Sequence, residues 1–151
     1  MAQTIRIAVA GPADRDVVVQ FLLQQFAEHS ISAPLDKLAA ASDAVLATDN
    51  LGFVLLAYDD QRPVGLAYVA LVWTLEHVGR SAWLQELYVA PDRRNRGIGR
   101  ALLTAALDRA REIGCSAADL EVDEHHRRAE TLYRRAGFAP LPRSRWVRTL
   151  R

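Results

Sequence analysis

A basic turn that contains two glycines has the residue types needed to bind a phosphorylated ligand. Four arginines fall within residues 93–100, and Gly97 and Gly99 lie among them. The following residues, 98–113, carry apolar side chains at helical spacing, which places the glycines at a helix N-terminus. The first N–H groups of a helix lack intrahelical partners and carry partial positive charge, and glycine lets an anion approach them closely. Guanidinium groups add charged donors for phosphate oxygens.

The elements around this turn decide between an anion site and an ordinary tight turn. An apolar run over 82–89 is predicted to be a strand that ends before Pro91. The helix over 98–113 ends at Gly114, a typical C-cap residue. Because an anion site of this kind needs a strand, a turn and a helix in that order, the context favours phosphate binding.

Two blocks of this sequence resemble one enzyme family. Arg94-x-x-Gly97-x-Gly99 is similar to the acyl-coenzyme A signature of the GNAT superfamily of N-acetyltransferases, and the strand end over 87–89 is also typical. A second block over 129–138, with Tyr133 followed by x-x-x-Gly-Phe, resembles the last helix of that family. The resemblance covers about residues 50 to 140. It implies transfer of an acetyl group from acetyl-coenzyme A (acetyl-CoA), as co-substrate, to a primary amine of a small molecule or peptide, by direct attack on the thioester.

The resemblance also implies which residues hold the cofactor. The pantetheine arm would bond to the backbone of the strand end over 87–89, where that strand separates from its neighbour at 117–123. The family commonly has asparagine three residues before Ala129, where this chain has His126, a donor whose charge depends on pH. The predicted cofactor-binding residues are Leu87, Tyr88, Val89, Arg94, Asn95, Arg96, Gly97, Ile98, Gly99, Arg100, His126 and Tyr133.

Tyr133 is the predicted proton donor to the leaving thiolate. In the family, the tyrosine at this position points toward the sulfur of the cofactor. Its place in an apolar stripe at helical spacing leaves open a second interpretation, in which Tyr133 is a core residue with a hydrogen-bonded hydroxyl.

Glu86 is the predicted general base or amine-binding acid. A primary amine is protonated at neutral pH, so a carboxylate or an ordered water must accept a proton before attack. Strand alternation predicts that Leu84, Glu86 and Tyr88 share one face. Family members that acetylate polyamines often carry acids at both 85 and 86, and Gln85 argues against strict polyamine specificity. A salt bridge to an arginine is the structural alternative, and the rival acids are Glu28, Glu76, Glu121 and Asp123.

The order of elements predicts a mixed α/β fold, an α+β mixed sheet that is mostly antiparallel and flanked by helices. The 151 residues, 50% of them hydrophobic, suit one domain over 1–151. The predicted order is β-α-α-β-β-β-α-β-α-β-β, as in GNAT proteins. Strands are expected at 4–9, 52–58, 64–76, 82–89 and 117–123, from Phe138 and at 146–150, and helices from Pro12, from Pro34, at 98–113 and at 125–136.

Composition narrows the partners and the compartment. A formal net charge of +1 gives no global field that would favour nucleic acid or a membrane. The single cysteine, Cys115, excludes an internal disulfide and is expected to be a packed thiol in a reducing, cytoplasmic compartment. No leader or long apolar run is evident. Adjacent His125 and His126 would point about 100° apart on a helix, so no metal site is predicted.

Two other functions can be compared with the acetyltransferase. A non-catalytic acyl-CoA sensor of the same fold would bind the cofactor without turnover. A dinucleotide-binding domain needs a third glycine where this chain has Leu102, and an early parallel βαβ unit, so it is disfavoured. The loops at 27–36 and 73–81 are expected to select the amine. The oligomeric state stays open, with a homodimer as one option.

Overall fold

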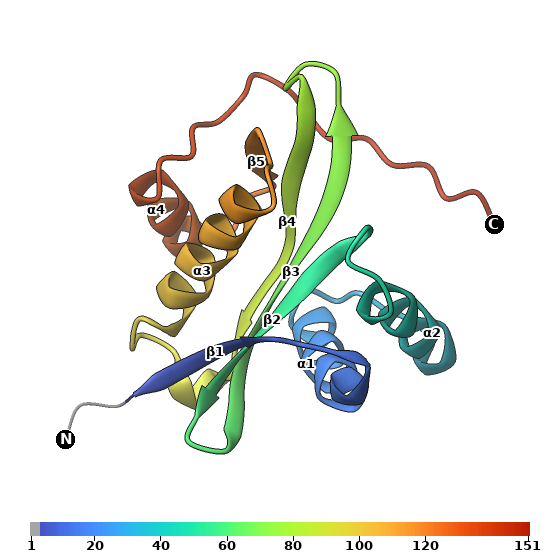
Figure 1. The fold of residues 1–151 in the computed structure, drawn as a ribbon, viewed down its shortest axis with the longest axis vertical. Helices are drawn as coiled ribbons and strands as arrows, with labels where there is room; N and C mark the ends of the chain where they lie inside the picture. The colour runs from blue at the N-terminus through green and yellow to red at the C-terminus, as the bar shows by residue number, and fades with distance from the viewer. Residues whose placement is uncertain (1–3) are drawn as a thin grey trace. The chain divides into compact units, whose positions relative to one another are not determined.

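A five-stranded mixed sheet forms the centre of the fold in this computed structural model, which describes residues 4–151 (Figure 1). The strands are β1 (Ile5–Val9), β2 (Gly52–Asp59), β3 (Arg62–Thr74), β4 (Gly79–Val89) and β5 (Ala117–Leu120), in the order β1-β2-β3-β4-β5. The first four strands pair antiparallel, and β5 pairs parallel with β4. Short turns join β2 to β3 and β3 to β4, whereas two helices lie between β1 and β2 along the chain. A parallel neighbour requires a crossover, which the helix between β4 and β5 supplies.

Helices cover both faces of this sheet (Figure 1). After the short η1 (Pro12–Asp14), α1 (Arg15–Glu28) and α2 (Leu35–Leu46) cover one face, and α3 (Ile98–Glu112), preceded by η2 (Pro91–Arg93), covers the other. The mixed α/β class predicted from the sequence is confirmed. Contacts divide the chain into two compact units, the first ending at Glu121 and the second beginning at Val122. The second unit contains α4 (Arg127–Arg135).

The core under α1 is built from alternate positions of the central strands. Buried side chains from α1, β2, β3 and β4 form one cluster: Val18, Phe21, Leu22, Val54, Leu56, Leu66 and Tyr88. Because successive strand residues point to opposite faces, the intervening residues pack under α3. Burial of these side chains provides the main stabilisation that holds α1 over β4.

Gly65 on β3 allows α3 to lie close to the sheet. A Cβ atom at this position would stand 2.9 Å from the Tyr88 carbonyl oxygen and 3.0 Å from Leu102 Cδ1. Gly65→Ala is therefore expected to destabilise the fold by about 1–3 kcal/mol, because backbone and a packed leucine must move. Urea unfolding would measure the change, with Gly11→Ala as the control, since a Cβ at Gly11 meets no atom within 4 Å. Equal stability of the two variants would contradict this account.

The two strands predicted at the C-terminal end are wrong. Among residues 136–151, all of which are described, no strand is present. Trp146 and Leu150 are each 91% exposed, so the apolar pattern that suggested a strand has nothing to bury against. Strands persist only with a partner for their backbone groups, and Pro140 and Pro142 remove two donors from this segment. The helix predicted over 125–136 is confirmed in type but begins at Arg127.

None of the helices within residues 4–151 combines the length and apolar character that crossing a lipid bilayer requires.

Candidate active site

A β-bulge in β4 determines which face of the sheet carries Glu86, the candidate base. Tyr68 on β3 pairs with Glu86, whereas the next residue, Val69, pairs with Leu84, so Gln85 is an extra residue on β4. Paired residues share a face of the sheet, which puts Glu86 on the face of Tyr68 and Leu84 on the opposite face. The simple alternation expected from the sequence, with Leu84 and Glu86 on one face, is wrong because of this bulge.

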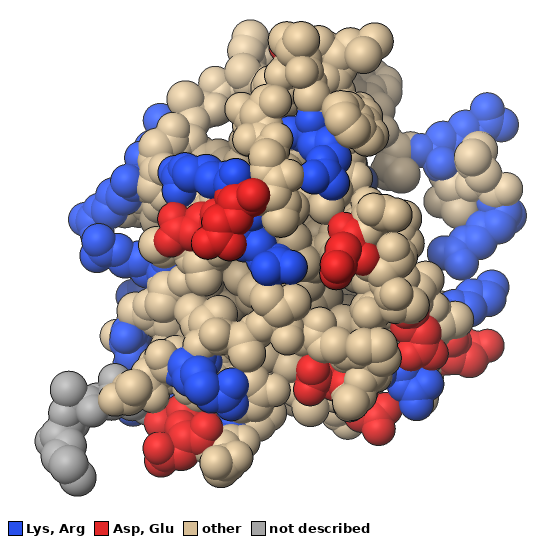
Figure 2. All heavy atoms as spheres, in the orientation of Figure 1, with Lys and Arg blue, Asp and Glu red and all other residues tan. Residues whose placement is uncertain are grey.

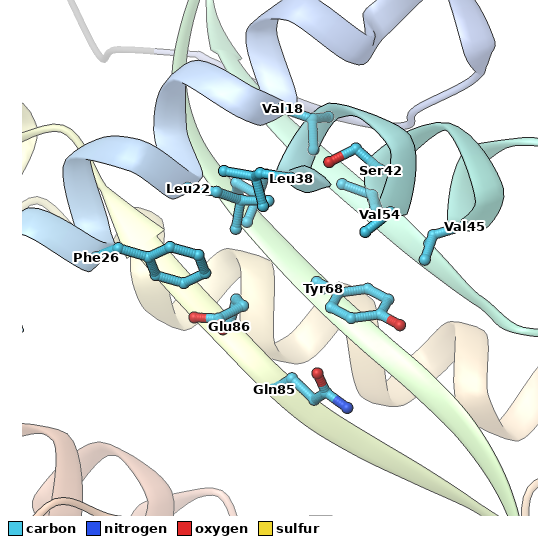
Figure 3. Close-up of a pocket in the computed structure, with 12 residues that line it drawn as sticks. Val18, Leu22, Phe26, Leu38, Ser42, Val45, Val54, Tyr68, Gln85 and Glu86 are labelled. Atoms are coloured by element: carbon cyan, nitrogen blue, oxygen red, sulfur yellow. The ribbon is translucent and has the colours of Figure 1, made fainter. Parts of the chain in front are cut away.

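Glu86 lines a cavity of about 180 Å³ between the sheet and the first two helices. Figure 3 shows Glu86, Gln85 and Tyr68 on the strands, with side chains of α1 and α2 above them. The lining residues are Val18, Leu22, Phe26, Leu38, Ala41, Ser42, Val45, Val54, Leu66, Tyr68, Gln85 and Glu86. Since most of these side chains are apolar, the Glu86 carboxylate stands in poorly solvating surroundings.

Burial raises the pKa of the Glu86 carboxyl to about 7. The pKa of the Tyr68 hydroxyl is raised as well, first by burial and then by the negative charge of Glu86. A carboxyl with this pKa is ionised in about half of the molecules at neutral pH, and its conjugate base is far stronger than an ordinary carboxylate. The salt bridge considered for Glu86 is not among the ion pairs found in residues 4–151.

The pairing between β4 and β5 ends next to the bulge at Gln85. Pairing with β5 ends at Leu84 and Leu120, so residues 85–89 extend beyond the paired part of β5. The Leu87 carbonyl accepts a hydrogen bond from Gln25 Nε2 at 3.4 Å, and the Val89 carbonyl accepts one from Arg94 Nε at 2.9 Å. These side chains occupy two of the backbone groups predicted to serve the pantetheine arm.

The turn after β4 has the backbone form expected of an anion site. Asn95 and Gly97 adopt left-handed conformations, with φ of 63° and 80°. Gly97 is the N-cap of α3, and the first bond of the helix runs from the Ala101 N–H to the Gly97 carbonyl at 3.0 Å. The N–H groups of Ile98, Gly99 and Arg100 precede that bond, so the helix geometry leaves them without helical partners.

Gly99 is not required by the packing of the protein itself. A Cβ atom there would meet only Val89 Cγ2, at the ordinary distance of 3.8 Å, and its φ lies outside the left-handed region. Gly97 likewise has no atom within 4 Å of an added Cβ, although its positive φ favours glycine. The space over the start of α3 is therefore open on the side where a phosphate would approach.

The arginines of the turn divide into two groups. Arg93 pairs with Asp59 at 3.2 Å and with Asp92 at 3.0 Å. Arg94 binds both carboxylate oxygens of Glu28, at 2.7 and 2.9 Å, so this rival acid has a structural partner. Arg96 and Arg100 are exposed, and neither has an ion pair among those found in residues 4–151.

Two of the predicted cofactor-binding residues, Tyr88 and Ile98, have buried side chains, so only their backbone groups are available to a cofactor. Tyr88 is buried with its ring 5.7 Å from that of Phe21, and its hydroxyl donates to Gln24 Oε1 at 3.1 Å. Ile98 is buried as well. Their side chains therefore serve the core.

The second unit holds two further predicted residues. His126 is the N-cap residue of α4, and the Tyr133 ring packs edge-on against Phe138 with centroids 6.1 Å apart. The roles inferred for them from the resemblance stay predictions. Of the remaining rival acids, Glu76 and Glu121 are exposed, and Asp123 Oδ1 accepts a bond from the His125 N–H at 3.0 Å.

Sequence reasoning did not find the pocket wall. Tyr68, Ser42 and the apolar side chains of α1 and α2 were treated as elements of the fold only. A tyrosine inside the apolar run of β3 was the one available signal for Tyr68. Cys115 is half-buried, and burial raises the pKa of its thiol, as suits a packed and unreactive residue.

Comparison with known proteins identifies the family to which this chain belongs. The model of the acetyltransferase (GNAT) family matches residues 18–138, so the chain belongs to that family. Over 94 residues, 60% of this chain, it is 42% identical to a mycothiol acetyltransferase of Acidimicrobium ferrooxidans, of which the match covers 28%. The matches cover 57%, 28% and 22% of the full length of three curated relatives, so the chain spans only part of their sequences.

Solved structures agree with the family assignment. An inferred acetyltransferase from Arthrobacter sp. FB24 is 31% identical and superposes with a TM-score of 0.83, with 99% of each chain covered. A predicted acetyltransferase from Clostridium acetobutylicum, solved with acetyl-CoA, has the same fold at 18% identity, with a TM-score of 0.82 and 96% of each chain covered. Sequence and fold therefore both place the chain in the acetyltransferase (GNAT) family.

Proposed function

We propose that this protein transfers the acetyl group of acetyl-CoA to a primary amine, with Glu86 as the general base. The observation that carries the proposal is the position of Glu86, a half-buried carboxylate that lines the cavity, on the part of β4 that extends beyond its pairing with β5. The open turn at the start of α3, with Gly97 and Gly99, fits the pyrophosphate of the cofactor.

Proton removal is the step in which Glu86 matters most. An alkylamine with a pKa of ~10.4 is neutral in about one molecule in a few thousand at pH 7, a handicap of roughly 4–5 kcal/mol. Glu86 accepts the ammonium proton, and the neutral amine nitrogen then bonds to the acetyl carbon as the C–S bond breaks. The nitrogen loses a second proton when the amide forms, which offsets the proton donated to the thiolate. When bound, acetyl-CoA supplies the acetyl group as a thioester, whose thiolate is the leaving group. Tyr133 is the proposed donor of a proton to that sulfur.

The relatives support acetyl-CoA and a small-molecule amine. The chain resembles mycothiol acetyltransferases and, over 67 residues at 43% identity, the streptothricin acetyltransferase of Streptomyces lavendulae. A structural neighbour was solved with acetyl-CoA. These names describe those proteins, and they leave the amine used by this chain to be identified.

Release of free thiol from acetyl-CoA, measured with a panel of amines and peptides, tests the proposal. Activity with any primary amine would support it. If calorimetry detects coenzyme A binding but no amine causes release, the protein is a sensor of this fold. If coenzyme A does not bind at all, the proposed anion site is wrong.

A further inference from the structure

We propose that the amine substrate is a compact, mainly apolar monoamine whose ammonium group lies at Glu86 and whose hydrocarbon body packs against α1 and α2. This inference rests on the proposed function, because it assigns the cavity at Glu86 to the amine. It also goes further, because it selects one chemical class among the amines that such an enzyme could take.

The wall of the cavity is the first argument. Eight of its twelve lining residues are aliphatic or aromatic without a polar atom, and they come from α1, α2 and the central strands (Figure 3). They are Val18, Leu22, Phe26, Leu38, Ala41, Val45, Val54 and Leu66. Such a wall favours a hydrocarbon body, because apolar surface leaves water, and it disfavours a polyhydroxylated body, whose hydroxyls would lose their hydrogen bonds to water.

The charge of the cavity is the second argument. Glu86 is the only ionisable carboxylate among the lining residues, and its neighbour on the bulge is the neutral Gln85. A second ammonium group of a diamine or polyamine would meet the apolar wall, at a large cost in lost hydration.

The charged side chains outside the cavity do not supply the second carboxylate that a diamine or polyamine would need. Arg15 binds Asp16 and Asp43, each at 3.3 Å, and so joins α1 to α2. Figure 2 shows both acidic and basic side chains over these helices.

The size of the cavity is the third argument. A volume of about 180 Å³ is well below the range of roughly 300–1,000 Å³ typical of sites that enclose drug-sized ligands. A ligand of several sugar rings would not be enclosed, whereas a short alkyl or arylalkyl chain would.

Ser42 on α2 supplies one polar contact. Its side chain is 6% exposed, and its hydroxyl oxygen has no hydrogen-bond partner among residues 4–151. Because a buried hydroxyl without a partner is unfavourable, this position can accept one polar atom of a ligand. The substrate can therefore carry a single hydroxyl or carbonyl group, but not many.

Binding and turnover measured separately test this inference. The full chain at pH 8 is titrated calorimetrically with phenethylamine, pentylamine, spermidine and kanamycin, with and without coenzyme A, and thiol release is followed with the same amines. We expect phenethylamine and pentylamine to bind at least 10-fold more tightly than the two polycations. From ethylamine to pentylamine, each methylene that enters the wall should improve binding by about 4-fold.

A pair of alanine variants on α2 locates the binding site. Both alanines are exposed, but only Ala41 lines the cavity, so Ala41→Leu narrows it, whereas Ala40→Leu adds the same side chain outside it. We expect Ala41→Leu to weaken phenethylamine binding at least 5-fold and to leave ethylamine binding unchanged, and Ala40→Leu to change neither.

The two proposals fail in different ways. Binding of apolar monoamines without thiol release would overturn the acetyltransferase mechanism and leave the inferred ligand class intact. Preference for spermidine or kanamycin, or no response to chain length, would overturn the ligand class even if acetyl transfer takes place. Equal effects of the two alanine variants would also contradict it.

Discussion

Glu86→Gln is expected to lower kcat for amine acetylation by about 10²–10⁴-fold, the usual contribution of a positioned general base. Glutamine has nearly the same shape as glutamate but cannot accept the ammonium proton. The substitution keeps the side chain in the cavity and removes only the ionisable group. Steady-state measurement of thiol release over a range of amine concentrations gives the change.

The pH profile of kcat is the second readout of this variant. In the wild type, Glu86 works in its ionised form, so kcat should fall as the pH drops below about 7, the raised pKa of this carboxyl. The loss should approach tenfold per pH unit. Glu86→Gln should lose this inflection. Glu28→Gln is the matched control, because Glu28 binds Arg94 outside the cavity lining, and it should keep the inflection.

The stability of Glu86→Gln shows whether a loss of activity comes from the missing base or from a damaged fold. The pKa of Glu86 is raised from 4.5 to about 7 by burial, so the ionised form disfavours folding. This penalty is absent below pH 4.5, grows as the pH rises from 4.5 to about 7 and is complete above pH 7. Glu86→Gln should therefore be more stable than the wild type at pH 8, on the order of 2 kcal/mol, with no gain at pH 4. An active and stable variant with an unchanged pH profile would show that another group is the base.

Gly99→Asp is expected to weaken coenzyme A binding by at least about 100-fold, since a carboxylate would stand where the pyrophosphate should lie. The same carboxylate suits the first turn of a helix in the free protein. An added Cβ at this position meets only Val89 Cγ2 at 3.8 Å, so the fold should accept it. Calorimetry with coenzyme A measures the affinity, and thermal unfolding checks the fold.

Gly99→Asn separates charge from bulk. It adds a side chain of the same shape without the negative charge, so its loss of affinity should be smaller than that of Gly99→Asp and less sensitive to salt. If both variants bind coenzyme A as tightly as the wild type, the start of α3 does not hold the pyrophosphate.

The sequence predicted correctly those features that depend on residues close together along the chain. The turn at Gly97 and the helix that follows it were recognised from short-range spacing, and α3 indeed begins at Ile98. Helix starts and turns depend on hydrogen bonds between residues a few positions apart, so their signals are local. The predicted strand at 146–150 failed because a strand also needs a distant partner, which an alternating pattern does not supply.

By itself, the sequence determined the family, the mixed sheet and the identity of Glu86 as a candidate. Only the tertiary structure decided what surrounds that carboxylate. The bulge at Gln85 is a property of the register between β3 and β4, and it places Glu86 beside Tyr68. Most of the apolar wall comes from α1 and α2, more than forty residues earlier in the chain. Because desolvation depends on every atom packed around a group, the raised pKa of Glu86 and the character of its cavity follow from long-range packing and not from the residues next to it.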